Sequence, residues 1–193
     1  MIGQSSKQRG FTLIELMVVI IIAAILLTIA VPSFSSLIKR NNVDSLQSKL
    51  SSALSTARTE AASRNRIITI CGSNAAQNAC GTDWSEGWII FEDSGTTGAY
   101  ANDGSEELID VYRHSSDYSI SSAADALSFN AQGFLVGGSN TLLLICEPDA
   151  EEQYARGLFV NQSGLVMKTR DTNSDGIHND PTSTNAASNL NCP

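Results

Sequence analysis

The chain has 193 residues, which is enough for one domain beyond an N-terminal anchor, and its formal net charge is −8. The acidic excess lies downstream, because 17 acidic and only 4 basic residues follow Arg66. A domain with this charge repels the phosphate backbone, which argues against nonspecific binding of nucleic acid.

An apolar stretch runs from Phe11 to Val31. Its only polar residues are Thr12, Glu15 and Thr28. As a helix, these 21 residues would extend about 31 Å, which matches the hydrocarbon thickness of a bilayer. The stretch is longer than the apolar core of a secretory signal peptide, and it does not end in an Ala-x-Ala-like cleavage site. We therefore expect a membrane-spanning helix.

Glu15 lies inside this apolar run, where inserting a carboxylate costs on the order of 2.5–3.5 kcal/mol. No lysine or arginine occurs between Arg9 and Lys39, so the span itself offers no cationic partner. An acid in such a position indicates a function, and its partner has to come from elsewhere. Basic residues flank the span on both sides, so charge counting leaves its orientation open.

The segment from Gly10 to Glu15, GFTLIE, follows a basic stretch and resembles the class III leader of type IV pilins and type II secretion pseudopilins. The resemblance implies that residues 1–10 are a leader, that a prepilin peptidase cuts between Gly10 and Phe11, and that the new amine of Phe11 is N-methylated. It also implies that Glu15 pairs with the N-terminal amine of a neighbouring subunit during assembly. The amine exposed at Phe11 would supply the cation that the span lacks.

Beyond the span, apolar residues recur from Phe34 to Ala61 at steps of mostly three and four. This period predicts an amphipathic helix over residues 32–65 that continues the membrane helix of residues 11–31. Pro32 removes a backbone hydrogen bond inside this pattern and clashes with the preceding turn, so we expect a helix kink there. The pilin resemblance implies a segment that extends when subunits pack into a filament; a simple kink with no such role is the alternative.

After Arg66 the apolar period becomes strand-like, and turn residues separate the runs. The predicted strands cover residues 66–71, 87–92, 107–113, 118–120, 127–130, 134–136, 141–146, 156–161 and 165–170. They are too closely spaced for intervening helices, so the sheet should be mostly antiparallel. We predict an α+β fold in which this sheet packs on the exposed half of the helix, with residues 66–193 forming one β-rich domain.

Four cysteines, Cys71, Cys80, Cys146 and Cys192, all follow the membrane segment. An even number in an exported domain predicts two disulfides in an oxidising compartment. Zinc binding is disfavoured because the spacing contains no Cys-x-x-Cys pair. Three pairings are open. We favour Cys71 with Cys80, which closes a short local loop, and Cys146 with Cys192, which ties the C-terminus to a strand.

The order of motifs in the β-rich part resembles the GspH/FimT family of minor pilins and pseudopilins. The similar segments are ITIC at 68–71, WSEGWIIFED at 84–93, LSFNAQG at 127–133, LLIC at 143–146 and FVNQSG at 159–164. The resemblance implies a type IV pilin-like fold and a structural role as a minor pilin in pilus assembly at the filament tip. The protein would first be a single-pass inner-membrane subunit with a periplasmic domain. Prepilin peptidase and other pilins are the implied partners, and a GspH-like type II secretion pseudopilin is the alternative.

One branch of this family includes a DNA-binding receptor for natural transformation, whose basic motif is Gly-Arg-x-Arg. A DNA-binding minor pilin of this kind is a further alternative, which the acidic charge and the sequence at this motif disfavour. The aligned residues here, 164–167, read GLVM, so both arginines are missing. Lys168 and Arg170 lie nearby, but acidic residues follow closely. We therefore do not expect this chain to bind nucleic acid.

Residues 171–180 form a candidate calcium site, and we expect no other cofactor. Asp171, Asn173 and Asp175 provide oxygens at loop positions 1, 3 and 5 and a glycine follows, as at the start of a calcium-binding loop. The glutamate expected at position 12 is missing, and Asp180 would have to substitute for it. A surface loop rich in Asn, Asp and Gly is the competing interpretation.

No arrangement of residues indicates an enzyme. His114 and His178 are isolated, and the sequence contains neither a nucleophile elbow nor a glycine loop that would cradle a phosphate. The acidic run 147–152 is interpreted as a solvated loop rather than an acid/base pair.

Overall fold

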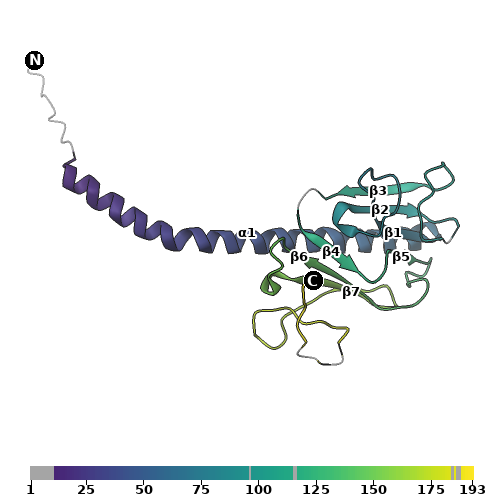
Figure 1. Cartoon of the computed structure of the whole chain (residues 1–193). Coiled ribbons are helices and arrows are strands. Elements are labelled where there is room, and N and C mark those ends of the chain that lie inside the picture. Colours follow the sequence, from purple (N-terminus) through teal and green to yellow (C-terminus); the bar gives the residue numbers. More distant parts are fainter. Residues whose placement is uncertain (1–10, 96, 115–116, 184, 186–187) are drawn as a thin grey trace, which may run out of the picture. The chain divides into compact units, whose positions relative to one another are not determined.

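The computed structural model describes residues 11–95, 97–114, 117–183, 185 and 188–193 (Figure 1). The chain divides into two units, one up to Lys39 and one from Arg40 onward. A single long helix, α1 (Leu13–Arg64), contributes to both. The two helical segments predicted from the sequence are therefore one element. It includes Pro32 without losing its helical assignment, and the kink expected there stays a prediction.

In the second unit, one face of α1 is buried. The buried positions follow one another at steps of three and four, so they lie on one side of the helix. They include Val43, Leu46, Leu50, Leu54, Ala57 and Ala61. This face belongs to the same hydrophobic core as Ile68, Ile70 and Trp88 of the sheets. The predicted amphipathic helix is thus explained by its packing against the strands.

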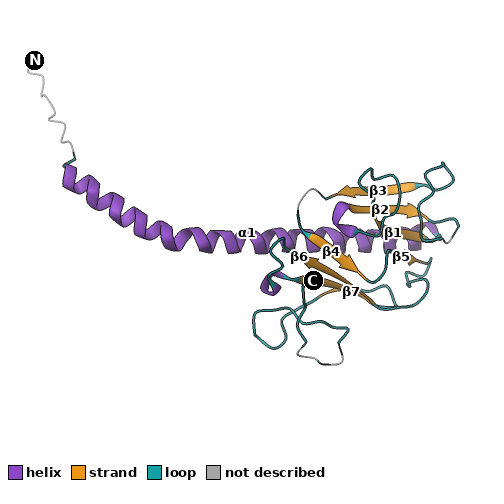
Figure 2. Cartoon of the chain, viewed as in Figure 1, coloured by secondary structure: helices purple, strands orange, loops and turns teal. Residues whose placement is uncertain are grey.

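The strands form two four-stranded sheets, drawn in orange in Figure 2, and each pairs antiparallel with its neighbours. The first sheet has the order β3-β2-β1-β5, with β1 (Ile68–Gly72), β2 (Gly87–Glu92), β3 (Leu108–Arg113) and β5 (Ala126–Phe129). The second has the order β4-β6-β7-β8, with β4 (Ser119–Ser122), β6 (Thr141–Cys146), β7 (Arg156–Val160) and β8 (Val166–Lys168). Two short 3-10 helices, Trp84–Glu86 and Glu152–Tyr154, precede β2 and β7.

The single sheet expected from the sequence is thus divided. The division arises because β4 pairs with β6, while β5 pairs with β1 instead of continuing from β4. The strand predicted at 134–136 is wrong: Leu135 forms only an isolated bridge with Phe129. Gly133 and Gly137 on either side adopt φ of 77° and 84°, and these left-handed conformations turn the chain before a strand can continue.

Two polar contacts fasten α1 to β7 inside the second unit. The Nε atom of Arg156 donates to Oδ1 of Asp44 at 2.8 Å, and the side-chain amide of Gln47 donates to the carbonyl of Gly157 at 2.9 Å. Arg156 and Gln47 are only 8% and 4% exposed. Because buried donors without partners are costly, these bonds specify how the helix lies on the second sheet.

The disulfides join Cys71 to Cys80 and Cys146 to Cys192, which confirms the pairing favoured from the sequence. The first links the end of β1 to the following loop. The second links the last residue of β6 to the C-terminal segment, whose Leu190 is buried beside Cys146 and Ala155. The C-terminus is therefore part of the folded unit.

Removing the Cys146–Cys192 disulfide should destabilise the protein more than removing the other. The linked residues are 46 apart in the sequence, against 9 for Cys71 and Cys80. From the entropy of loop closure in the unfolded chain, the free energy of unfolding should fall by about 4 kcal/mol without the longer loop and by about 2.5 kcal/mol without the shorter one. Urea unfolding of the two double alanine variants, followed by tryptophan fluorescence, measures both. An equal or smaller loss for the longer loop would contradict the expectation.

Candidate assembly site at the start of α1

The first turn of α1 is closed by a side-chain cap. The Thr12 hydroxyl oxygen accepts a hydrogen bond from the Glu15 amide at 3.3 Å, and the Thr12 carbonyl accepts one from the Leu16 amide at 3.2 Å. Thr12 is thus the N-cap and Glu15 the third helical residue, which is the spacing of a capping box. The sequence interpretation treated Thr12 only as a polar interruption, although a threonine three residues before a glutamate is a signal for this cap.

The apolar side chains that follow are exposed on every side of the helix. From Leu13 to Ile29, the large apolar residues are 47–76% exposed. This part of α1 is long and apolar enough to cross a membrane. A helix that is apolar all round needs lipid or neighbouring helices as its surroundings.

Phe11 and Glu15 lie at the N-terminal end of this apolar surface. Phe11 is 85% exposed, and Glu15 is exposed in the first helical turn, where the helix dipole favours a negative charge. Among the described residues, no cationic side chain forms an ion pair with Glu15. The predicted cleavage point begins at Gly10, which lies outside the described residues together with the rest of the leader.

Comparison with known families gives two matches. Residues 5–31 match the model of the prokaryotic N-terminal methylation motif, and residues 47–164, more than half of the chain, match that of the type II transport protein GspH. The chain belongs to the GspH family. It is a structural subunit of the minor pilin and pseudopilin class, as the resemblance of its motifs implied. Members of this class associate with other pilins in filaments.

Two crystal structures of the type IV minor pilin FimU from Pseudomonas aeruginosa, strain PAO1, resemble this GspH-family chain. The structure in space group P21 is 23% identical in sequence, with a TM-score of 0.54, and the match covers 66% of this chain and 88% of the FimU chain. The structure in space group P65 is 22% identical, with a TM-score of 0.52, and the match covers 66% of this chain and 92% of the FimU chain. They confirm the predicted α+β fold. A comparison with curated proteins found no match.

The candidate calcium loop of this GspH-family protein is organised by its own hydrogen bonds. The Asp171 carboxylate accepts from the amides of Ser174 and Gly176 at 2.7 and 2.9 Å. Asp175 accepts from the side chain of Asn189, which is the main reason why its pKa lies below the usual value.

The loop carboxylates are not gathered into a cation site. Asp180 accepts from the amide and hydroxyl of Thr182, outside the turn that Asp171 closes, and Asn173 donates its side-chain amide to Asp175. Within the described residues, the acidic side chains with oxygens all within 4.8 Å of one another are Glu147, Asp149 and Glu151, in a different loop. This arrangement favours the interpretation as a surface loop, and calcium binding at residues 171–180 stays a prediction.

We expect millimolar calcium to leave the thermal unfolding temperature unchanged, because the loop oxygens already accept hydrogen bonds from the chain. Isothermal titration of the protein in detergent, with a chelator-treated sample as control, measures this directly. Saturable heat together with a chelator-sensitive unfolding temperature would contradict it.

The acidic run at 147–152 is not simply a solvated loop. Glu147 is only 2% exposed, and its carboxylate accepts from the amides of Asp149 and Glu151 at 3.1 and 2.8 Å. It holds the turn that follows β6. In the sequence, Glu147 directly follows Cys146, the last residue of a predicted strand, and this position is the signal that could have indicated its role.

The segment aligned with the DNA-binding motif lies at β8. Leu165 and Met167 stand where that motif has arginines, and they are 47% and 40% exposed. Of the two nearby cations, Lys168 donates to the Ser48 hydroxyl of α1 at 2.9 Å. The surface at these positions is apolar, so it offers little to a phosphate backbone.

The two histidines are half-buried. Burial, with Lys49 nearby, lowers the pKa of His114, and burial, with Arg156 nearby, lowers the pKa of His178. The Thr169 hydroxyl accepts from the Gly157 amide at 2.8 Å and shares a hydrogen bond with Nδ1 of His178 at 3.1 Å. This bond places His178 in a structural contact between β7, β8 and the C-terminal segment.

Proposed function

We propose that this protein is a minor type IV pilin that takes part in pilus assembly near the filament tip. The observation that carries the proposal is the start of α1: a capped helix with an apolar surface on all sides and one acid in its first turn. A helix with an exposed apolar surface of this extent is not stable in water. It is suited first to a membrane and then to the helix-lined interior of a filament.

In this proposal, prepilin peptidase cuts between Gly10 and Phe11, and the amine of Phe11 is then methylated. The match to the N-terminal methylation motif supports this step. The globular unit would lie in the periplasm while α1 spans the inner membrane. The positive amine of one subunit then pairs with Glu15 of its neighbour, which removes two isolated charges from an apolar environment.

A type II secretion pseudopilin is the second candidate. The description of the matching family model favours it, since it names a type II transport protein. The fold likeness to a type IV minor pilin favours the pilus. Neighbouring genes discriminate the two, because pilus genes would support the first and secretion genes the second.

The test isolates the native protein from membranes and from sheared pili and determines its N-terminus by mass spectrometry. We expect N-methylated Phe11 in both fractions. The Gly10→Val variant is the control, and it should remain uncut and confined to membranes. Native protein that still begins at Met1 would refute the processing step, and mature protein missing from pili would refute the pilus function.

A further inference from the structure

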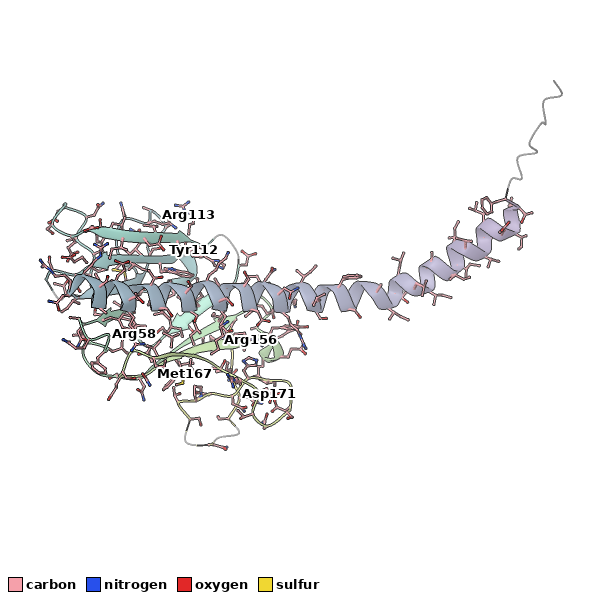
Figure 3. The ribbon with its side chains drawn as sticks, turned by 180° about the vertical axis from the view of Figure 1, so that it is seen from behind. Arg58, Tyr112, Arg113, Arg156, Met167 and Asp171 are labelled. Atoms are coloured by element: carbon pink, nitrogen blue, oxygen red, sulfur yellow. A yellow bond between two sulfur atoms is a disulfide. The ribbon has the colours of Figure 1, made fainter. Side chains whose placement is uncertain are left out.

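A polar pocket lies between the second unit's part of α1 and the β3–β4 region. Its volume is about 260 Å³. The lining residues are Asn42, Ser45, Leu46, Lys49, Tyr112, His114 and Tyr118. Tyr112 projects from β3 (Figure 3), so helix and strand each supply part of the wall. None of the assembly residues described above belongs to this pocket.

Both tyrosine hydroxyls of the pocket accept hydrogen bonds from α1. The Lys49 ammonium donates to the hydroxyl oxygen of Tyr112 at 3.1 Å, and the Asn42 side-chain amide donates to that of Tyr118 at 3.3 Å. A hydroxyl that accepts in this way keeps its own proton for another acceptor. Lys49 likewise uses one of its three N–H groups for Tyr112. The wall of the pocket therefore contains several hydrogen-bond donors.

The charge of the pocket is opposite to the net charge of the sequence that follows Arg66. None of the seven described lining residues is acidic, and Lys49 brings a permanent positive charge. His114 is half-buried, and this burial, with Lys49 nearby, holds its pKa below the usual value. In contrast, 17 acidic and 4 basic residues follow Arg66. A site with one cation and hydroxyl donors suits a single negative charge.

Two of these donors, Tyr112 and Lys49, are positioned by contacts within the chain. The Tyr112 ring stacks on Trp88 with centroids 4.3 Å apart, and Trp88 is only 1% exposed. The Lys49 ammonium lies 5.2 Å from the centroid of the same ring. Preorganised donors reduce the entropy that binding would otherwise cost.

We propose that this pocket receives the carboxylate of an Asp or Glu side chain from a neighbouring pilin subunit. A carboxylate has two oxygens that accept up to four hydrogen bonds, which matches Lys49 and the two tyrosine protons. Phosphate carries more charge and is usually held by arginine or by several cations, so it fits this single lysine less well. The inference rests on the proposed function, because only a filament brings a second subunit to the pocket.

Carbodiimide cross-linking tests the pairing directly, because it joins an amine to a carboxylate in contact with it. Intact pili that contain the full-length processed protein are treated, digested and analysed by mass spectrometry. We expect Lys49 to be linked to an Asp or Glu of another subunit. Lys168 is the matched control, since it also donates to a hydroxyl but lies outside the pocket.

Variants give a second, independent measurement. Lys49→Met should reduce the amount of protein in sheared pili about tenfold or more, because a hydrogen bond to a charged group is lost. Lys168→Met should leave that amount unchanged. Tyr118→Phe keeps the ring and removes only the hydroxyl, so it should lower the Lys49 cross-link yield even if Lys49→Met proves unstable.

The outcomes separate the pocket from the proposed function. Protein missing from pili altogether would refute the pilus function. Protein present in pili, with Lys49 unlinked or linked only within its own chain, would refute the pocket. Normal incorporation of stably folded Lys49→Met would refute it as well.

Discussion

The Gly164→Ala variant is expected to lose about 3 kcal/mol or more of stability. Gly164 has a φ of 73°, which disfavours any residue with a Cβ atom. In addition, a Cβ at this position would lie 2.0 Å from the carbonyl oxygen of Gly133. That oxygen belongs to the backbone and already accepts a hydrogen bond from Arg58 Nε at 3.1 Å, so it cannot move away cheaply.

Gly137→Ala is the matched control for this substitution. Gly137 has a similar φ of 84°, but a Cβ there would have no heavy atom within 4 Å. Only the conformational strain remains, which costs about 1–2 kcal/mol. Urea unfolding of both variants, followed by tryptophan fluorescence, measures the loss in the free energy of unfolding. The difference between the two losses is the contribution of the steric clash, apart from the backbone strain. Equal losses at the two positions would contradict the close packing of the loops at 133 and 164.

The Glu15→Ala variant is expected to be cleaved normally but largely lost from pili. In the function proposed above, cleavage acts on the bond between Gly10 and Phe11, whereas only assembly requires the pairing of Glu15 with an amine. Without Glu15, the N-terminal amine of the neighbouring subunit has no partner. An unpaired charge inside the apolar environment costs about 2.5–3.5 kcal/mol, which corresponds to roughly a hundredfold weaker recruitment. Immunoblots of membrane and sheared-pilus fractions measure recruitment, and the mass of the mature protein reports cleavage.

Glu60→Ala provides the control on the same helix. Glu60 pairs with Arg64 at 2.6 Å, four residues along α1, and such partly exposed pairs contribute little to stability. This variant should enter pili at the wild-type level. Normal incorporation of Glu15→Ala would remove the assembly role of the charge pair, and an uncut Glu15→Ala precursor would assign Glu15 to processing instead.

Elements with a strong local pattern were predictable from the sequence. The strands at Gly87–Glu92 and Thr141–Cys146 have the bounds that were expected, because both are runs rich in β-branched and large apolar residues. The division into two sheets was not predictable. It depends on β5 reaching across to β1, a pairing between residues about sixty positions apart that no local period encodes.

The candidate functional residues divide in the same way. Glu15 was found because an acid inside an apolar run is conspicuous in any sequence. The pocket around Lys49 was not found, since it brings together α1, β3 and Tyr118 just before β4, and none of its residues is unusual by itself. Sites made by a single segment can be read from a sequence, whereas sites made by distant segments need the fold.

The Thr12 cap has a consequence for the order of events at the N-terminus. Both members of the cap, Thr12 and Glu15, lie downstream of the proposed cut, so removing the leader does not disturb the first helical turn. The modifying enzymes would then act on a short segment ahead of an intact first helical turn. The mature terminus could turn toward an adjacent subunit by rotation of the Phe11 backbone, without breaking the hydrogen bonds that Thr12 accepts.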